Sequence, residues 1–457
     1  MNRVVRRSAI LMLLVISLTV GCVMFLGEYL LYAKDWVLAE GSPHIYSDYS
    51  SVCGTIVDRN GKVLMDTTGG RIYGDDPLVN SSVIHWLGDR QGSIYAPMLS
   101  YYAKEMTKFN TVNGLYVYGN DNGTVKLTLS SKVQAAALEA LGEYKGTIAV
   151  YNYKTGEILC AVTNPTYDPD NKPDIEADTE GIWDGAYINR FLKATYTPGS
   201  IFKIVTLAAA IETIPDIQEQ TFTCNGETIY GIDKVTCMKE HGNLTLDEAF
   251  LNSCNCAFAA IADQLGGKVL QEYAEKMGVG DVISFDGMKS VAGSIKAEGE
   301  ADVLVAWSGI GQHKDQINPC QFLTMMGAIA GGGSAAKMHL VSSITGGGWG
   351  DYIAEVESTE PILSAETVEI LQKLMRNNVE NYYGDENFEG LTVCAKSGTA
   401  ELGGDLEPNA MFAGFVADEE YPLAFILVVE NAGSGRKTCV PMLSKVLAAC
   451  KEVLDRE

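Results

Sequence analysis

The sequence predicts an α+β protein with three parts, and three observations support this prediction. An uncharged, largely apolar run near the N-terminus makes a membrane-spanning helix the expected form of residues 1–33. Residues 34–126 are polar, aromatic and glycine-rich, which favours a small β-rich domain. Residues 127–457 combine helical patterns with strand patterns that form hairpins, as expected of an α+β domain with an antiparallel sheet.

The charge balance argues against one class of function. The 457 residues include 34 Lys and Arg against 58 Asp and Glu, which gives a formal net charge of −24. A protein that binds nucleic acid needs a basic surface to neutralise phosphates, and no basic patch is evident in this sequence. We therefore expect no nucleic-acid partner.

The N-terminal apolar run is expected to be an uncleaved signal anchor. It extends from residue 8 to residue 27, which is long enough to cross a bilayer, and it follows Arg3, Arg6 and Arg7. Positive flanks stay in the cytoplasm, so we expect one crossing of the cell membrane, a cytoplasmic N-terminus and an extracytoplasmic remainder. A cleaved signal peptide and lipid attachment at Cys22 are the alternatives. The run continues past any small-residue cleavage site and past Cys22, which favours the anchor.

Residues 34–126 are expected to form a pedestal that spaces the next domain from the membrane. Residues 51–64 are typical of two short strands around an Asn60-Gly61 turn, a strong signal for a β-hairpin. Strong helical periodicity is evident only near residues 98–109. The segment contains no obvious cluster of catalytic residue types.

The large domain begins with a predicted helix and a predicted hairpin. Residues 127–141 have an apolar face at helical spacing, and Ser130 or Ser131 can cap this helix. Two strands are predicted next, at 146–152 and 157–162. An antiparallel meander is predicted near the end of the chain, with strands at 391–399, 411–416 and 423–429.

Ser200 and Lys203 form the first candidate catalytic pair. A Pro-Gly pair precedes them, and residues 201–212 are an apolar, helix-compatible run. Residues three apart share a helix face, so the amine of Lys203 can reach the hydroxyl of Ser200. Burial disfavours the charged amine, and a hydroxyl beside a neutral amine is an activated nucleophile. The same spacing at 334–337 follows three glycines and opens no clear apolar helix, so we interpret it as a loop.

Ser253-Cys254-Asn255 is the second candidate motif. A Ser-x-Asn pair on a tight loop directs a hydroxyl and an amide into one cleft, where the hydroxyl can relay a proton and the amide can hold substrate backbone. Taken alone the motif is uninformative, since Ser and Asn mark caps and turns everywhere. We interpret Cys254 as a packing residue.

Lys396-Ser397-Gly398-Thr399 is the third candidate motif and lies at the end of a predicted strand. Gly398 has no side chain, so a substrate can approach the strand backbone closely. The charge of Lys396 and the hydroxyls of Ser397 and Thr399 can bind a carboxylate, and the strand backbone can pair with an extended peptide. If the third motif is considered alone, the alternative is that it is an exposed strand end without function.

The eleven cysteines are scattered and do not form a small-domain disulfide framework. Cys224 and Cys237 are the exception, because they bracket a short polar segment typical of a hairpin. A disulfide between them is one interpretation in an extracytoplasmic setting, and two free thiols are another. A metal site that includes His241 is a third, but a fourth ligand is not evident. We expect no metal and no cofactor.

The three candidate motifs, taken together and in this order, resemble the signatures of penicillin-binding, active-site serine transpeptidases. Joint agreement is far more specific than any single motif. Four further stretches are similar to the family, at 54–61, 154–162, 164–169 and 308–312. The chain is most similar to class B, monofunctional penicillin-binding proteins with a short pedestal. The resemblance implies a β-lactamase/transpeptidase-like fold: a central antiparallel sheet with helices on both sides, and a cleft between the sheet and a helix-rich lobe.

The resemblance also implies roles for the first two motifs. Ser200 would attack the D-Ala–D-Ala carbonyl of a peptidoglycan stem peptide, expel the terminal D-Ala and form an acyl-enzyme. Lys203 would be the base. Ser253 would carry the proton to the departing amine, and Asn255 would hold the donor peptide and orient Lys203.

For the third motif the resemblance implies substrate binding. Lys396 would supply positive potential, Ser397 and Thr399 would bind the terminal carboxylate, and Gly398 would leave the strand backbone accessible. The backbone N–H groups of Ser200 and Thr399 would form the oxyanion hole. An amine from a neighbouring stem peptide would then resolve the acyl-enzyme and make the cross-link, whereas β-lactams would acylate the serine and stay there.

Other proteins of this fold are the alternatives. A membrane-anchored β-lactamase needs a device for rapid deacylation by water, and no Glu-centred motif is evident for it. A D,D-carboxypeptidase would hydrolyse instead of transferring, and a non-catalytic β-lactam sensor or scaffold would not turn over. The segment at 34–126 is too short for a glycosyltransferase domain. The implied partners are peptidoglycan stem peptides, β-lactams, the cytoplasmic membrane and a membrane glycosyltransferase of the shape, elongation, division and sporulation type.

Overall fold

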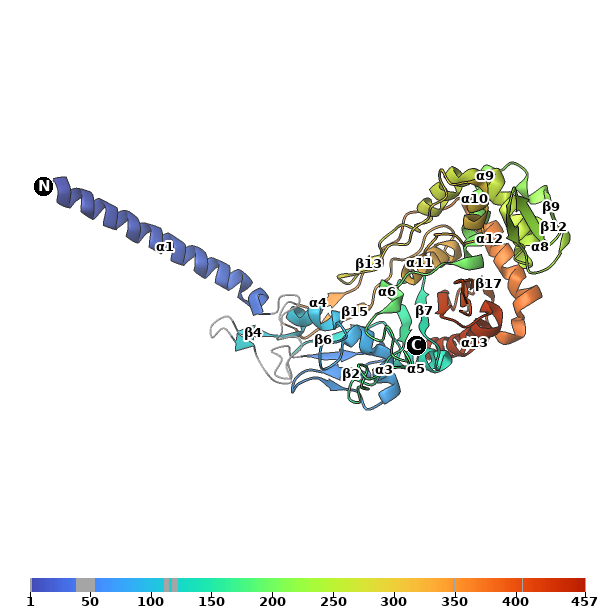
Figure 1. Cartoon of the computed structure of the whole chain (residues 1–457). Helices are drawn as coiled ribbons and strands as arrows, with labels where there is room; N and C mark the ends of the chain where they lie inside the picture. Colours follow the sequence, from blue (N-terminus) through green and yellow to red (C-terminus); the bar gives the residue numbers. More distant parts are fainter. Residues whose placement is uncertain are drawn as a thin grey trace.

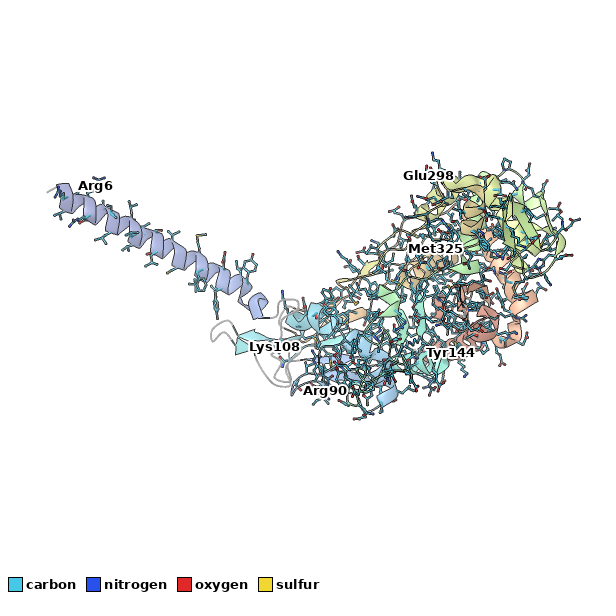
Figure 2. All side chains as sticks on the ribbon, in the orientation of Figure 1. Arg6, Arg90, Lys108, Tyr144, Glu298 and Met325 are labelled. Atoms are coloured by element: carbon cyan, nitrogen blue, oxygen red, sulfur yellow. The ribbon has the colours of Figure 1, made fainter. Side chains whose placement is uncertain are left out.

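A long N-terminal helix points away from the folded body of the chain (Figure 1). The structure is a computed structural model that describes residues 2–37, 54–110, 115–116, 122–347, 350–404 and 406–456. Helix α1 (Asn2–Val37) contains a segment, Arg3–Tyr32, that is long and apolar enough to cross a membrane and is not buried against the protein. Arg6 lies near the far end of α1 (Figure 2).

The pedestal contains the predicted hairpin within a six-stranded sheet. Strands β1 and β2 pair in antiparallel register, and the Asp58 carboxylate between them accepts hydrogen bonds from the N–H groups of Asn60 and Lys62. Gly61 has a φ of 85°, which glycine adopts without steric cost. The hairpin prediction is confirmed for residues 54–64, and residues 51–53 lie outside the described ones. The strands, in sheet order, are β16 (Tyr352–Ile353), β15 (Val341–Thr345), β6 (Thr124–Leu127), β1 (Thr55–Val57), β2 (Val63–Asp66) and β3 (Ile72–Tyr73).

Two features of the pedestal differ from the sequence analysis. Strands β15 and β16 come from much later in the chain, and β15 pairs with β6, so the sheet draws on both sides of residue 126. A second helix, α3 (Pro77–Leu87), precedes the expected helix α4 (Pro97–Met106). Helix α3 has no clear polar face, because it buries Asn80, Ser82 and His85 together with its apolar residues. The short strands β4 (Phe109–Asn110) and β5 (Leu115–Tyr116) form a separate pair.

The centre of the large domain is a five-stranded antiparallel sheet with apolar residues on both faces. In β19, Ala424, Ile426 and Val428 belong to one buried cluster, whereas the alternate residues Phe425 and Leu427 belong to another. This period of two is that of a strand covered on both sides. In sheet order the strands are β17 (Val393–Ala400), β18 (Asn409–Val416), β19 (Leu423–Val429), β7 (Gly146–Asn152) and β8 (Ile158–Asn164).

Helices cover both faces of this sheet, as the resemblance implied. Helix α5 (Ser131–Leu141), capped by the Ser130 side chain, shares one buried cluster with α13 (Gly435–Leu454). Helix α11 (Pro319–Ala330) packs on the other face, against β18, β19 and β7. The α+β prediction with a central antiparallel sheet is therefore confirmed.

The helix-rich lobe lies beyond α11 (Figure 1). Helix α7 packs against α9 and α12 in this lobe. The remaining helices of the large domain are α6 (Arg190–Lys193), η1 (Gly199–Phe202), α7 (Lys203–Thr213), η2 (Ile217–Glu219), α8 (Leu246–Leu251), α9 (Asn255–Lys276), α10 (Asp302–Gly309), α12 (Ala365–Asn378), η3 (Val379–Tyr383) and η4 (Asp385–Asn387). The remaining short strands are β9 (Thr221–Cys224), β10 (Glu227–Tyr230), β11 (Asp233–Thr236) and β12 (Gly242–Thr245) in the lobe, and β13 (Ser284–Phe285) and β14 (Met288–Lys289) nearer the pedestal (Figure 1).

Candidate active site

Ser200 lies in the tight turn η1, directly before helix α7. The turn is held from two sides. Gly199 donates its N–H to Gly311 O at 2.8 Å, and η1 packs against the edge strand β17. Gly199 has a φ of 53°, and a Cβ there would lie 2.6 Å from Thr399 O, so only glycine fits. The turn that carries the first motif therefore packs directly against the strand that carries the third.

The amine of Lys203 makes three short contacts, all with the second motif. Nζ donates to the backbone carbonyl of Ser253 at 2.7 Å and to the side-chain oxygen of Asn255 at 2.7 Å, and it lies 3.1 Å from the Ser253 hydroxyl. The first two partners can only accept hydrogen bonds. A neutral amine has two N–H groups for these two oxygens, and its lone pair is then left for a hydroxyl.

The orientation of the Asn255 amide is fixed by a second contact. Its nitrogen donates to the backbone carbonyl of Thr236 at 2.8 Å, so its oxygen must face Lys203. Asn255 is the first residue of α9, and Ser253 sits in the turn before it with a φ of 51°. A positive φ is uncommon for serine, which marks this turn as an unusual backbone position.

Ser253 also contacts the third motif. Lys396 Nζ, on β17, lies 3.1 Å from the Ser253 hydroxyl and 3.1 Å from Ser397 O. The three motifs are therefore linked through one hydroxyl oxygen that lies between two amines. Lys203 is 0% exposed and Lys396 is 1% exposed.

Burial changes the protonation of both amines. Loss of hydration disfavours the charged form and lowers the pKa of Lys203 to about 7. The same loss of hydration, followed by repulsion from Lys203, lowers the pKa of Lys396 well below its ordinary value. Two ammonium groups around a single hydroxyl repel each other, so the pair favours one proton fewer than two free lysines would carry.

The strand that carries the third motif is an edge of the central sheet. Strand β17 pairs with β18 on one side only. On its other side, side chains of the α12–η3 segment already bond the backbone as far as Ser397: Val393 O accepts from Arg376, Ala395 O accepts from Asn378, and the Ser397 N–H donates to Tyr383. A Cβ on Gly398 would lie 3.0 Å from Pro198 O and 3.1 Å from Ile201 Cγ2. Gly398 is therefore needed for the contact between β17 and the Ser200 turn, in addition to the substrate access that the sequence predicted. Thr399 is exposed at the same edge.

Tyr383 is a site residue that the sequence analysis missed. Its hydroxyl donates to Ser397 Oγ at 2.9 Å and accepts from the backbone N–H of Ser397 at 2.7 Å. The ring is buried, and burial raises the pKa of Tyr383 to about 12, so the hydroxyl stays protonated. Tyr383 therefore fixes the position of the Ser397 hydroxyl. A lone tyrosine far from the motif gives no signal in the sequence.

A cluster of potential metal ligands adjoins the second motif. Cys224, Cys237, His241 and Cys254 offer ligand atoms that all lie within 4.8 Å of one another. The three cysteines are free thiols in the structure. Cys254 is fully buried in the core, as expected of a packing residue, and it also provides the fourth potential ligand atom that the sequence left unidentified.

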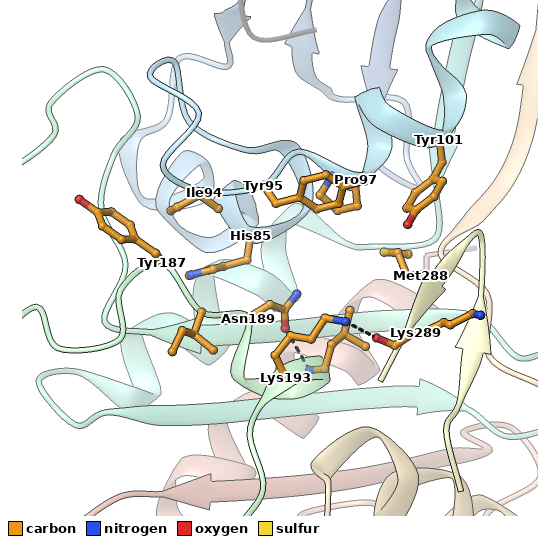
Figure 3. A pocket seen from close by; sticks show the side chains of 12 residues that line it. His85, Ile94, Tyr95, Pro97, Tyr101, Tyr187, Asn189, Lys193, Met288 and Lys289 are labelled. Carbon is orange, nitrogen blue, oxygen red and sulfur yellow. Dashed lines mark hydrogen bonds between the residues drawn. The ribbon is translucent and has the colours of Figure 1, made fainter. Parts of the chain in front are cut away.

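A cavity lies apart from this site, at the junction of the pedestal and α6 (Figure 3). Its volume is about 240 Å³. His85, Tyr95 and Tyr101 line it from the pedestal, and Asn189 and Lys193 line it from the two ends of α6. None of its lining residues belongs to the three motifs.

The comparisons with known proteins agree with this architecture. The penicillin-binding protein transpeptidase domain matches residues 146–448. The peptidoglycan D,D-transpeptidase PbpA of Mycolicibacterium smegmatis is 27% identical over 344 residues, which are 68% of each chain. PbpA of Mycobacterium tuberculosis is 25% identical over 430 residues, covering 82% of this chain and 86% of that one. Stage V sporulation protein D of Bacillus subtilis is 30% identical over 342 residues, 69% of this chain and 51% of that one.

Solved structures show the same fold. The crystal structure of penicillin-binding protein A from M. tuberculosis superposes with a TM-score of 0.74 at 21% identity, covering 88% of this chain and 99% of that one. The D,D-transpeptidase domain of a peptidoglycan glycosyltransferase from Eggerthella lenta superposes with a TM-score of 0.74 at 24% identity, covering 88% and 98%. The chain belongs to the family of penicillin-binding proteins with a transpeptidase domain, and its relatives are of class B.

Proposed function

We propose that this protein is a membrane-anchored peptidoglycan D,D-transpeptidase that works through an acyl-enzyme on Ser200. Its two PbpA relatives are named peptidoglycan D,D-transpeptidases, and M. tuberculosis penicillin-binding protein A has been solved as a ceftriaxone acyl-enzyme. The single observation that best supports the proposal is the set of contacts around Lys203. Two acceptor-only oxygens take two N–H groups of its buried amine, which leaves a lone pair for a proton.

The proposed acylation step transfers one proton along the site. Ser200 Oγ attacks the carbonyl carbon of the penultimate D-Ala, and its proton passes to Lys203 Nζ. The Ser253 hydroxyl, 3.1 Å from Lys203 Nζ, then gives its proton to the nitrogen of the terminal D-Ala as the C–N bond breaks, and takes the proton from Lys203 in return, so that both residues end as they began. An ester on Ser200 and a free D-Ala result. Asn255 keeps Lys203 in place through its fixed amide oxygen.

The proposed substrate site lies along β17. Beyond Ser397, the edge of β17 at Thr399 would pair with the extended donor peptide, as in other cases of strand addition. Lys396, Ser397 and Thr399 would bind the terminal carboxylate, and its negative charge would keep Lys396 protonated. The backbone N–H groups of Ser200 and Thr399 would stabilise the oxyanion, at about 3 kcal/mol per donor. An amine of a neighbouring stem peptide would then attack the ester and complete the cross-link.

The proposed orientation puts this site outside the cytoplasm. Three arginines precede the apolar segment of α1, so the N-terminus would stay inside and the folded body would lie outside. The reaction would then take place at the cell wall, next to membrane proteins that supply glycan strands. A solved complex of penicillin-binding protein 2 with MreC from Helicobacter pylori shows that a protein of this fold can assemble with another protein. We propose a membrane glycosyltransferase of the shape, elongation, division and sporulation type as the partner here.

The test uses the full-length protein in detergent and a fluorescent penicillin. Wild-type protein should be labelled covalently, and mass spectrometry should locate the label on Ser200. Ser200→Ala should lose the label, and a precursor with a D-Ala-D-Ala stem should yield cross-linked product and free D-Ala with the wild type only. Covalent labelling of Ser200→Ala would rule out Ser200 as the nucleophile. Free D-Ala without cross-links would identify a carboxypeptidase instead.

A further inference from the structure

We propose that Cys224, Cys237, His241 and Cys254 bind one zinc ion, which holds the second catalytic motif in place. The four residues come from four different places in the lobe: the end of β9, the residue after β11, the residue before β12 and the cap of α9. They converge although they span 31 residues of the chain. Convergence of this kind is what a metal site requires and what chance packing of thiols rarely gives.

The separations between the ligand atoms match a tetrahedral zinc site. His241 Nδ1 lies 3.5 Å from Cys224 Sγ and 3.5 Å from Cys237 Sγ. Cys237 Sγ lies 4.0 Å from Cys254 Sγ. A zinc ion at the usual bond lengths places its sulfur and nitrogen ligands roughly 3.5 to 3.8 Å apart in a tetrahedron. Small adjustments of the side chains would therefore suffice.

The chemistry of the four ligands selects zinc and a structural role. Thiolates are soft ligands and imidazole is a good zinc ligand, so this set favours zinc over the hard cations. Three cysteines and one histidine fill all four positions, which is the closed arrangement of a structural site and leaves none for a reacting water. Binding would release the protons of the three thiols to solvent. Cys224 and Cys254 are fully buried, so the ion would be well shielded.

The surrounding segment would gain a further link to the lobe. Residues 221–245 form two separate two-stranded sheets, β9–β12 and β10–β11. A sheet of two strands is marginal in water. Phe222, Val235 and Leu244 anchor these sheets in the core, whereas Ile232 and Met238, in the two connecting loops, are almost fully exposed. A metal that joins β9, the two loops and α9 would add a link between the loops and this anchored part.

The proposed zinc would also act on the catalytic residues, and this part rests on the proposed function. Cys254 stands between Ser253 and Asn255, the two residues that hold the amine of Lys203. The backbone N–H of Asn255 also donates to Cys237 Sγ at 3.3 Å. Fixing Cys254 and Cys237 to one ion would hold Ser253 in its left-handed conformation and Asn255 in its orientation. Cys254 and Cys237 would thus be positioning residues.

The first test is the zinc content of the full-length protein, purified in detergent with a phosphine reductant and without a metal-affinity column. We expect about one zinc per chain in the wild type. The control Cys320→Ala, which removes a buried cysteine on α11 outside the cluster, should keep it. Cys224→Ala and Cys254→Ala should each lose most of it. Zinc retained in both of these variants would overturn the proposal.

A second measurement covers the case in which the cysteine variants do not fold. The wild-type protein, stripped with a chelator and loaded with cobalt, should show the intense near-ultraviolet absorption of cobalt bound to thiolates. No such band and no zinc in reduced wild-type protein would overturn the proposal. A peptide with Cys224 disulfide-bonded to Cys237, recovered as the main species from protein isolated without reductant, would do the same.

The effect on catalysis is tested separately from binding. Removing zinc should slow labelling by fluorescent penicillin about tenfold or more, since small misplacements of catalytic groups have effects of this size, and added zinc should restore it. Unchanged labelling would overturn the positioning role. Zinc binding without any labelling, in the wild type, would instead contradict the proposed function and leave the metal site standing.

Discussion

The side-chain oxygen of Asn255 lies 2.7 Å from the amine of Lys203. Of the two ends of this side-chain amide, only the oxygen can face the amine. The reason is the second contact of the same amide, whose nitrogen donates to the carbonyl of Thr236. Asn255 therefore neutralises no charge and accepts one N–H. It stabilises the position of Lys203 while allowing the amine to lose its proton. A carboxylate in place of the amide would favour the protonated form of Lys203. We therefore expect the activity of the site to depend on the protonation of Lys203.

The rate of acylation should follow the neutral fraction of Lys203. Burial lowers the pKa of Lys203 to about 7, so the amine is protonated and inactive as a base below this pH and neutral above it. Acylation by penicillin should rise with pH, reach half of its maximum near that pKa, and fall about tenfold per pH unit on the acid side. Stopped-flow measurement of the acylation rate constant across the neutral range checks this. A flat profile would contradict the role of Lys203 as base.

Asn255→Asp should move this profile to higher pH. A carboxylate at the same distance favours the ammonium form of Lys203 and should raise its pKa by about 1 to 3 units. Acylation at neutral pH should therefore fall about tenfold or more, and part of it should return in alkaline buffer. The measurement is the same pH series.

The matched control is Asn252→Asp. Asn252 lies three residues earlier, is exposed, and donates to Glu248 O instead of to a catalytic group. Its substitution should leave the midpoint of the profile unchanged. Equal profiles for both variants would show that Asn255 does not control the protonation of Lys203.

The sequence predicted the central sheet well because its signals are local. Strands β7, β18 and β19 are runs of apolar and β-branched residues that lie within a residue or two of the expected bounds. The Ser130 cap likewise marked the start of α5. Each of these elements is specified by neighbouring residues, and tertiary contacts only reinforce them.

Elements that depend on distant partners could not be predicted. Strand β15 becomes part of the pedestal only through its pairing with β6, far away in the sequence. Helix α3 buries polar as well as apolar residues, so its sequence has no amphipathic pattern. The Ser-x-x-Lys pattern at 334–337 shows that a local pattern can also occur without a functional site. Lys337 forms an ion pair with Glu357 on the surface and contacts none of the three motifs.

The candidate site shows the same division. Ser200, Lys203 and the other motif residues were identified because the three motifs are compact in sequence and their order is informative. Cys254 gave no sign of its proximity to Cys224, Cys237 and His241, because the four residues are spread over loops with no standard spacing. Tyr383 was missed because its contact with Ser397 joins η3 to β17 and leaves no trace in either segment.

Gly398→Ala should separate the edge strand from the Ser200 turn. The added Cβ would lie about as close to Pro198 O and Ile201 as contacts allow, so β17 or η1 must shift by a few tenths of an ångström. We expect a loss of about 1 to 3 kcal/mol in the free energy of unfolding and a clear loss of acylation rate. Thermal unfolding and penicillin labelling measure the two effects.

Gly280→Ala is the matched control for this substitution. A Cβ at Gly280 meets nothing within 4 Å, and its φ is not positive. Stability and labelling should both stay near those of the wild type. If Gly398→Ala behaves like this control, the close contact between β17 and the Ser200 turn is not needed for acylation.

Tyr383→Phe should weaken substrate binding more than it slows the chemical step. The substitution removes the donor to Ser397 Oγ and leaves the backbone N–H of Ser397 without its acceptor. The Ser397 hydroxyl can then rotate away from the expected carboxylate position, at a cost of about 1 to 3 kcal/mol. The dependence of the labelling rate on penicillin concentration should show a higher half-saturating concentration and a nearly unchanged limiting rate.

Tyr382→Phe, which alters an exposed neighbouring ring, should change neither value. A lower limiting rate with unchanged half-saturation for Tyr383→Phe would place this tyrosine in the proton-transfer path, because only a group acting on the bond-breaking step produces that result.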